Sequence, residues 1–580
     1  MKRDLFYFII IFVVFSLAVI VATGFDPEVL KVDKGCYGNN TASVLEDGDL
    51  NTINQALPRD RWLVTKTYNH PDFHDHGIAT LWIPFFAYWK LLEVFDVEPG
   101  VYKSEKYDVS QIVANIFYGM ICLVLIYRFM FSFFDDKRKI LLSIGTVCFG
   151  TSFYWYFLFH PANSDITITI LPVILVGLYL YLQNSDNKWK WGLFGLIFGC
   201  MSIIKVSMVF YLLILLHNVV LYWRYNPWNT VKVRYLPFVS GFIISIIPFL
   251  INERIKYGFF NYGHLSLFNE SYYLLKEVVL GPSGYFYVSP IYFIFLCSLI
   301  IYLIRLCRNK NSLNTGLHSF FAFLGIVLVV KTLIESFTFG GNGGLGARHF
   351  IVDTFVCVLF IHFVTKKLKF YKLWILYIPA ILWTLMVSVW YFHHLPNSPV
   401  TWGQNYIVDM DFFRPTILLM LERFSIIVDN LGSLLFAAFK YSPLIAISSF
   451  LVIKLYKMPR KKDLEYKVFK IFGLYIFGCY LLITCLNVVF NSENVELMKQ
   501  DNFFSKTVVA GGVNLYSYDE NVSSMLRMSR YLSKRGDLEG AEKIEKTKQK
   551  YIKQIMGEIL VDPVGFKKNL EKEILRRPFN

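Results

Sequence analysis

Charged residues are scarce in this sequence, and their scarcity argues against an ordinary soluble protein. Only 17% of the 580 residues are charged, whereas 55% are hydrophobic and 18% are aromatic. Apolar runs that approach or exceed about 18 residues recur along the chain, which is typical of membrane-spanning segments. The alternating pattern of barrel strands is missing, so we predict that the spans are α-helices, which satisfy their own backbone hydrogen bonds.

Cysteine patterns that would indicate other classes of protein are also missing. The nine cysteines lie mostly inside apolar runs, and their spacing indicates neither a disulfide framework nor a zinc site. The net charge of +15 comes mainly from Lys and Arg in short loops between apolar runs, as the positive-inside rule expects. We therefore interpret this charge as membrane topology and predict no nucleic-acid partner.

The order of the apolar runs predicts an all-α fold, a polytopic membrane bundle of about 13 transmembrane helices. The first helix, Leu5 to Thr23, follows two basic residues and has no convincing signal-peptide cleavage site, so we expect it to be retained. A large first outer loop follows at residues 24–110, in which Ile78 to Phe95 is expected to form an interfacial helix. Trp191 to Trp223 is too long for one span, so we predict two short helices that meet near Lys205.

This topology predicts two regions, with the N-terminus in the cytoplasm and the C-terminus outside. Residues 1–490 would form the transmembrane domain and residues 491–580 a small outer helical domain, in which Ser529 to Leu560 is expected to form a helical hairpin. The remaining spans are predicted at residues 111–134, 140–159, 166–182, 235–251, 286–304, 317–333, 350–365, 373–391, 431–453 and 468–490.

Acidic residues and histidines gather in the first outer loop, between Leu45 and Gly77. Within this stretch Gly48 separates Asp47 from Asp49, and a glycine there permits a tight turn that brings both carboxylates toward one point. Such a pair can take a proton from an acceptor hydroxyl or hold a divalent cation. The alternative interpretation is an Asx-turn or a helix N-cap on a solvated loop.

The same loop carries His70, His74 and His76, a spacing that could serve zinc. The run lacks the HExxH order, and an extended loop that contains proline would not hold two of these rings on one helix face. We predict instead that the three histidines line a polar substrate pocket, together with Asp165 and Tyr285 from later outer loops.

Two further features could bind an anion. Lys205 lies within the long apolar run, where a charge usually has a partner or a function, and it could neutralise a lipid phosphate or extend to the membrane surface. The segment GGNGGLGARH ends at Arg348 and His349. Its glycines would let backbone amides approach an anion, and a guanidinium binds phosphate bidentately. A flexible turn with an arginine anchored at the interface is the alternative.

Taken together, these features resemble the GT-C superfamily of integral membrane glycosyltransferases, including protein mannosyltransferase-like and polyprenyl-phosphate-sugar-dependent bacterial members. The resemblance covers roughly residues 1–490. It rests on the acidic Asp47-Gly48-Asp49 motif after the first helix, the broken pair with Lys205, the GPSGYFYVSP segment that contains Tyr285, and the glycine-rich segment that ends at Arg348. Val206 follows Lys205 where relatives often have proline.

The resemblance implies a function and roles for these residues. The donor would be a sugar linked to polyprenyl phosphate, the acceptor a glycan, lipid or protein, and the setting the lipid bilayer of the bacterial inner (plasma) membrane. Asp47 or Asp49 would act as general base for inverting transfer, and Arg348, Lys205 and His349 would bind the donor phosphate. No cofactor is assigned, and a divalent cation, Mg²⁺ or Mn²⁺, is left open.

Two other functions compete with this interpretation. A lipid-glycan flippase or secondary transporter predicts charges deep in the spans along a pathway, whereas the predicted spans are mostly bare apart from Lys205 and Lys331. A polysaccharide polymerase or ligase would suit a large outer loop near the middle of the chain, but the large loop here follows the first helix. Both observations favour the glycosyltransferase.

Overall fold

The fold is helical in almost every part that the structure describes. The computed structural model describes residues 34–50, 52, 76–95, 103–158, 164–222, 227–257, 285–308, 316–338, 348–365, 368–394, 446–447, 450–451, 453–455, 462–499, 507–510, 513–516, 539–547 and 549–550. The predicted first helix, Leu5 to Thr23, lies outside these residues, and so does most of the predicted span at residues 431–453.

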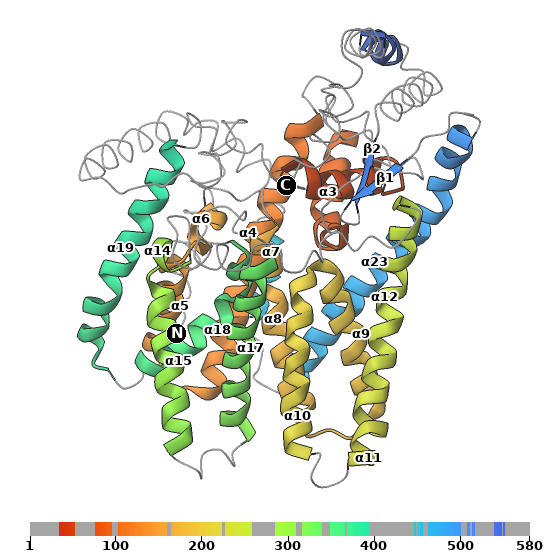
Figure 1. Cartoon of the computed structure of the whole chain (residues 1–580). Coiled ribbons are helices and arrows are strands. Elements are labelled where there is room, and N and C mark those ends of the chain that lie inside the picture. The colour runs from red at the N-terminus through yellow and green to blue at the C-terminus, as the bar shows by residue number, and fades with distance from the viewer. Residues whose placement is uncertain are drawn as a thin grey trace, which may run out of the picture. The chain divides into compact units, whose positions relative to one another are not determined.

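The helices follow one another in the order drawn in Figure 1. In the first half of the chain they are α2 (Lys34–Glu46), η2 (His76–Ile78), α3 (Ala79–Phe95), α4 (Lys103–Phe133), α5 (Lys137–Gly150), α6 (Phe153–Leu158), α7 (Asp165–Ile168), α8 (Ile170–Leu182), α9 (Lys188–Ile204), η3 (Val206–Leu213), α10 (Ile214–Tyr222), α11 (Pro227–Thr230), η4 (Val231–Tyr235) and α12 (Leu236–Tyr257). In the second half they are α14 (Tyr285–Val288), α15 (Ile291–Arg308), α17 (Gly316–Thr338), η6 (Arg348–Asp353), α18 (Thr354–Thr365), α19 (Phe370–His394) and α23 (Lys462–Lys499).

The chain divides into two compact units, each of which we describe by itself. Unit 1 comprises Met1–Gly38, Gly77–Ile246 and Leu267–Gly478. Unit 2 comprises Asn39–His76, Ile247–Ser266 and Cys479–Asn580.

Several helices are long and apolar enough to cross a membrane, so this is a membrane protein. Among the described residues four candidate spans meet this criterion: Val113–Phe133, Asp165–Leu182, Pro227–Tyr257 and Tyr466–Asn491. Shorter apolar helices accompany them at Val206–Val219, Ile291–Leu306, His318–Ile334, Ile351–Phe363 and Tyr377–Val387. The predicted total of about 13 spans stays a prediction, because parts of the chain lie outside the described residues.

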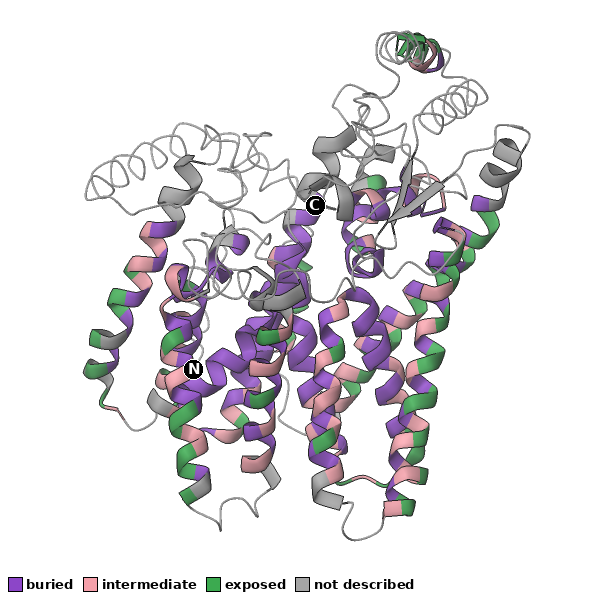
Figure 2. Ribbon diagram, viewed as in Figure 1, coloured by how far each residue is buried: buried purple, intermediate pink, exposed green. Residues whose placement is uncertain are grey.

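Burial separates central helices from peripheral ones (Figure 2). The apolar window of Asp165–Leu182 is 83% buried, whereas that of Pro227–Tyr257 is only 28% buried. In unit 1, α18 packs against both α5 and α15 and is buried along most of its length. The exposed windows carry large aliphatic side chains, which water would not favour and lipid would.

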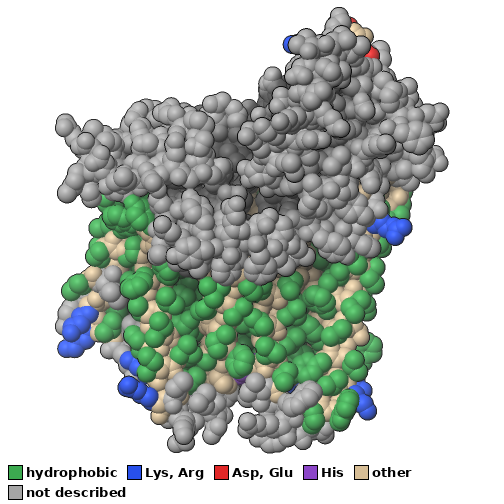
Figure 3. Space-filling view, viewed as in Figure 1, with side chains coloured by type: hydrophobic (Ala, Val, Ile, Leu, Met, Phe, Trp, Pro, Cys, Tyr) green, Lys and Arg blue, Asp and Glu red, His purple; other side chains and the backbone are tan. Residues whose placement is uncertain are grey.

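The surface view agrees with a membrane setting. Figure 3 shows hydrophobic side chains over the sides of the helices on this face, with Lys and Arg gathered near helix ends. Exposed basic residues of unit 1 flank helix termini, as the sequence predicted from its short basic loops; they include Lys137, Arg138, Lys188, Lys232, Arg305, Arg308, Lys369 and Lys372.

The predicted break in the long apolar run is present. α9 ends at Ile204, and Lys205 adopts an extended conformation with φ −147° and ψ 114°. The chain continues as the 3-10 helix η3 before α10 begins. A 3-10 stretch of this length is uncommon and often marks strain or a functional hinge.

The predicted single span at residues 140–159 is instead divided, which corrects the sequence-based expectation. α5 ends at Gly150, and Thr151 is extended at φ −126° and ψ 172°. The Thr151 hydroxyl donates to the Val147 carbonyl at 2.7 Å and accepts from the Phe153 amide at 3.2 Å. One threonine side chain therefore serves the end of α5 and the start of α6, a local competition that hydrophobicity alone does not reveal.

The predicted helical C-terminal region also contains a pair of short strands. β1 (Thr507–Ala510) pairs with β2 (Val513–Tyr516) in antiparallel register, with Thr507 opposite Tyr516. Further along, Lys546 Nζ lies 2.7 Å from Glu542 Oε1, an i,i+4 pair of the kind that the charge pattern predicts.

Glycines allow α9 and α12 to approach closely within unit 1. A Cβ added at Gly195 would lie 1.9 Å from the Phe238 carbonyl oxygen, and one added at Gly241 would lie 2.0 Å from the Gly192 carbonyl oxygen. Both obstacles are backbone atoms, which cannot rotate away. This is the small-residue contact by which membrane helices pack without a hydrophobic driving force.

We expect Gly195→Ala to lower stability by about 1–3 kcal/mol, because the added methyl group forces two backbones apart. Gly145→Ala is the matched control, since nothing lies within 4 Å of a Cβ built there; it should be neutral or stabilise by up to about 1 kcal/mol. Thermal unfolding of both variants in detergent measures the difference. Equal melting temperatures would show that the close approach has no energetic consequence.

Candidate functional site

Asp165 opens the helical run α7–α8 and is buried, with 2% of its surface exposed. The surrounding contacts hold this helix start firmly: the Thr167 amide donates to Asn115 Oδ1 at 3.1 Å, and the Thr167 hydroxyl bonds the same oxygen. Trp82 Nε1 in turn donates to the Thr167 hydroxyl oxygen at 3.0 Å. Residues from α3 and α4 thus fix the position of the carboxylate-bearing turn.

Lys205 reaches this carboxylate from the break after α9. Its Nζ lies 3.8 Å from Asp165 Oδ1, and only 12% of its side chain is exposed. That separation is an ion pair but is too long for a direct hydrogen bond. Lys205 and Asp165 were predicted separately, as a phosphate-binding residue and a pocket residue, and unit 1 brings them together.

The backbone around this pair is closely packed. A Cβ added at Gly77 would lie 2.6 Å from the Ile203 carbonyl oxygen, so the end of the predicted first-loop motif lies against the last turn of α9. The Lys205 carbonyl accepts from the Met208 amide at 2.9 Å. Ser207, between them in sequence, is buried.

Residues of η3, α17 and η6 form a second buried ion pair and its hydrogen bond. Lys331 Nζ lies 2.6 Å from Asp353 Oδ2, and both side chains are fully buried. The Tyr211 hydroxyl donates to Asp353 Oδ1 at 2.7 Å. Sequence reasoning noticed Lys331 only as an isolated charge and missed Asp353, although an acid inside the predicted span at residues 350–365 was a usable signal.

These two ion pairs belong to one group of packed elements in unit 1. η6, which begins at Arg348 and ends at Asp353, packs against α7, the helix that begins at Asp165. η3 follows Lys205 directly and packs against α17, which carries Lys331. The elements that carry Asp165, Lys205 and Arg348 therefore converge.

Several predicted site residues lie outside what the structure describes. His70 and His74 lie outside the described residues, and so do the side chains of Arg348, His349 and Tyr285. Their assigned roles stay predictions.

The acidic motif of the predicted first outer loop lies in unit 2. Gly48 has φ +75°, the left-handed conformation that the glycine between two acids predicts. The amides of Asp47 and Gly48 both donate to the Ser43 carbonyl, at 2.8 and 3.1 Å. Asp49 is buried, and its Oδ1 accepts from the Ser43 hydroxyl at 2.8 Å. Asp47 is half-buried.

His76, also in unit 2, lies between aromatic rings. Its ring stacks on Phe249 at 5.6 Å and on Tyr480 at 6.3 Å between centroids. Its Nδ1 lies 3.9 Å from Glu253 Oε1, and the residue is 2% exposed. A ring packed in this way suits a positioned polar group better than an open binding surface.

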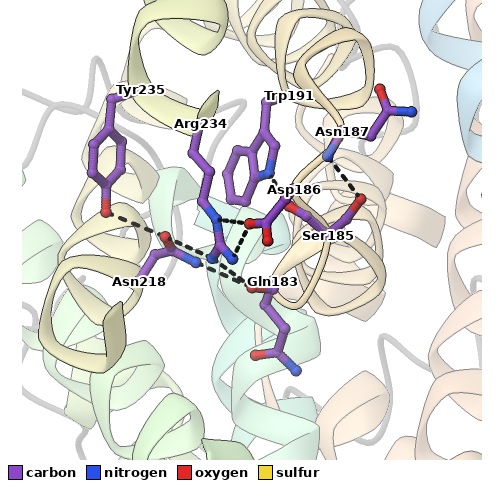
Figure 4. Close-up of polar contacts among 8 residues, drawn as sticks. All are labelled: Gln183, Ser185, Asp186, Asn187, Trp191, Asn218, Arg234 and Tyr235. Carbon is purple, nitrogen blue, oxygen red and sulfur yellow. Dashed lines mark hydrogen bonds and ion pairs between the residues drawn. The ribbon is translucent and has the colours of Figure 1, made fainter. Parts of the chain in front are cut away.

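A third polar cluster joins α8, α9, α10 and η4 in unit 1 (Figure 4). Arg234 is its centre: Nη2 lies 2.7 Å from Asp186 Oδ1, and Nη1 donates to the Gln183 carbonyl at 2.8 Å and to Asn218 Oδ1 at 3.3 Å. The guanidinium also lies 5.7 Å from the Trp191 ring centroid. Asp186 is mostly exposed whereas Arg234 is 4% exposed, so we interpret the cluster as a structural clamp.

Within the described part of the chain, no group of three or more His, Cys, Asp or Glu side chains is arranged to hold a metal ion. Comparison with family models, with curated proteins and with solved structures finds no match to this chain.

Removing one partner of the Lys331–Asp353 pair should destabilise the protein strongly. We expect Lys331→Met or Asp353→Asn alone to cost about 3–5 kcal/mol, because each leaves a buried charge uncompensated. The double variant should be more stable than either single variant, because both charges are then absent. Thermal unfolding of the four proteins checks this, and additive losses would contradict a direct pair.

Arg234→Lys should lower stability by about 1–3 kcal/mol, because an ammonium cannot reproduce the fork of hydrogen bonds to Gln183 and Asn218. Asp186→Ala should cost less than about 1 kcal/mol, because an exposed carboxylate contributes little. The comparison decides whether the clamp depends on the buried amide contacts or on the ion pair. A larger loss of stability in Asp186→Ala than in Arg234→Lys would show that the clamp depends on the ion pair.

Proposed function

We propose that this chain is a membrane glycosyltransferase that moves a sugar from a polyprenyl-phosphate-linked donor to a glycan, lipid or protein acceptor at the outer face of the membrane. The observation that carries the proposal is the Asp165–Lys205 pair at the break between α9 and η3. Lys205 is held by a buried carboxylate whose helix, α7, packs against η6, the helix that begins at Arg348. We propose this part of unit 1 as the place where a phosphate binds among apolar helices.

The charge of the reaction explains the need for such cations. When the anomeric C–O bond breaks, the bonding electrons leave with the phosphate oxygen, and the leaving polyprenyl phosphate gains one negative charge. Lys205, Arg348 and His349 are proposed to stabilise this charge, which is where preorganised cations contribute most. In the resting enzyme Asp165 keeps the ammonium of Lys205 in place.

The acceptor must lose a proton as its oxygen attacks the anomeric carbon from the opposite side, which inverts the configuration. By the GT-C resemblance we assign this proton to Asp47 or Asp49 as general base. His70, His74 and Tyr285 are proposed to contact the sugar or the acceptor, whereas the packed ring of His76 is proposed to be a positioned polar group. The donor is a lipid, which agrees with a sequence that has apolar helices and no nucleotide-binding motif.

The positions of the basic loops suggest how the protein is oriented in the membrane. The basic loops of unit 1 are proposed to face the cytoplasm, with Asp165 and Lys205 at the other ends of the same helices. We propose the bacterial inner membrane as the location.

The test measures sugar transfer in liposomes with a panel of labelled polyprenyl-phosphate sugars. It compares four single variants with wild type: Asp49→Asn, Asp47→Asn, Asp165→Asn and Lys205→Met. Lys205→Met should lower the turnover number by about 10²–10³-fold, the usual loss for one charge-stabilising group, and at least one of the two first-loop variants should abolish transfer. Lys188→Met, which alters an exposed lysine, is the control and should keep wild-type turnover. Full activity in all four variants would contradict the assigned site.

One observation favours a second function, a lipid-glycan flippase. The Lys331–Asp353 pair is fully buried between apolar helices, where a transport pathway would need charge. A flippase moves the intact glycolipid and forms no glycosidic bond. Liposomes that contain the purified protein separate the two: a new glycoside product supports the transferase, whereas leaflet exchange of unchanged donor supports the flippase.

A further inference from the structure

A chain of buried amides runs through unit 2. Asn491 Nδ2 donates to Asn487 Oδ1 at 3.3 Å, and Asn487 Nδ2 donates to Asn252 Oδ1 at 3.0 Å. Asn252 Nδ2 donates to the Thr484 hydroxyl oxygen at 2.9 Å, and that hydroxyl donates to the Tyr480 carbonyl. All three amides are at most 2% exposed. Buried polar side chains are costly unless they have hydrogen-bond partners, and here the amides supply partners to one another.

This series of amide hydrogen bonds ends at the acidic turn of the predicted first outer loop. The Leu50 amide, immediately after Asp49, donates to Asn487 Oδ1 at 3.0 Å across 437 residues of sequence. A Cβ added at Gly48 would lie 2.8 Å from the Phe490 ring, so the turn lies directly against this part of α23. Asn487 therefore contacts the turn, and Phe490 limits its approach.

The carboxylate of Asp49 is consequently held from two sides. The Ser43 hydroxyl orients Oδ1 directly. Asn487 holds the next backbone amide and so sets the direction in which the Asp49 Cα–Cβ bond points. The requirement at Asn487 is specific, because the side chain must accept from Leu50 and donate to Asn252 at the same time. An amide does both, whereas an ionised carboxylate only accepts.

We propose that Asn487 is a positioning residue for the Asp47–Asp49 turn, and that it keeps the general base in its working orientation. This inference rests on the proposed function, in which that turn supplies the base. A displacement of about 1 Å in a catalytic group can lower turnover by about 10²-fold. Asn487 itself touches no reacting atom in this account.

The test compares Asn487→Ala, Asn487→Asp and the matched control Asn491→Ala in the full-length protein in nanodiscs. Asn491→Ala removes the second donor to Asn487 Oδ1 and leaves the Leu50 bond intact. We expect Asn487→Ala to lower kcat by about 10–100-fold with KM for the donor within about 2-fold of wild type. Hydrogen exchange at the Leu50 amide should become faster in Asn487→Ala and stay unchanged in Asn491→Ala.

Asn487→Asp supplies a second readout. Its protonated carboxyl accepts and donates like the amide, whereas its ionised form loses the donor to Asn252. Activity relative to wild type should therefore recover as the pH falls through the pKa of the introduced group. A general loss of packing would show no such recovery.

The outcomes separate the two proposals. Wild-type transfer with unchanged kcat in Asn487→Ala overturns the positioning role and leaves the proposed function standing. If kcat falls in Asn491→Ala as much as in Asn487→Ala, the loss is due to packing, and the positioning role is overturned as well. No transfer by wild type with any donor contradicts the proposed function, and the positioning role falls with it.

Discussion

The ion pair between Asp165 and Lys205 is the interaction on which the helix break at Lys205 and the proposed phosphate site depend. A charge among apolar helices is expensive unless a second charge compensates it, and here each partner supplies the other with that compensation. The pair also explains the local structure. α9 stops at Ile204 and the chain becomes extended at Lys205, so the side chain leaves the helix close to Asp165, the residue at which α7 begins. A helix break and a buried charge are two aspects of one site.

The other polar contacts of unit 1 separate into those that support this site and those that hold the helices elsewhere. Asn115 and Trp82 fix the turn that carries Asp165, and the Lys331–Asp353–Tyr211 network joins η3, η6 and α17. The Arg234 cluster joins the far ends of α8, α9 and α10. The side chain of Lys205 at the break is only 12% exposed, and irregular backbone among membrane helices is tolerated where protein surrounds it.

Sequence reasoning located most of the long apolar helices that the structure describes, and this break, because apolar run length is a local property that the chain displays directly. Trp191 to Trp223 was too long for one span, and Lys205 marked the place to divide it. Side-chain pairs between distant elements could not be predicted in this way. Asp353 with Lys331, and Asn487 with Leu50, depend on helix register and rotation across long separations, which periodicity does not determine. The break at Thr151 was missed because one hydroxyl, not hydrophobicity, decides it.

We propose that Lys205 binds phosphate and that Asp165 holds it in place, and a structure with a bound lipid tests this directly. The measurement is a cryo-electron microscopy map of the protein in nanodiscs with added polyprenyl phosphate. We expect phosphate density in contact with Lys205 Nζ, with the α7 and η6 helix starts on either side. Phosphate bound elsewhere, with the Asp165–Lys205 pair unchanged, would contradict it.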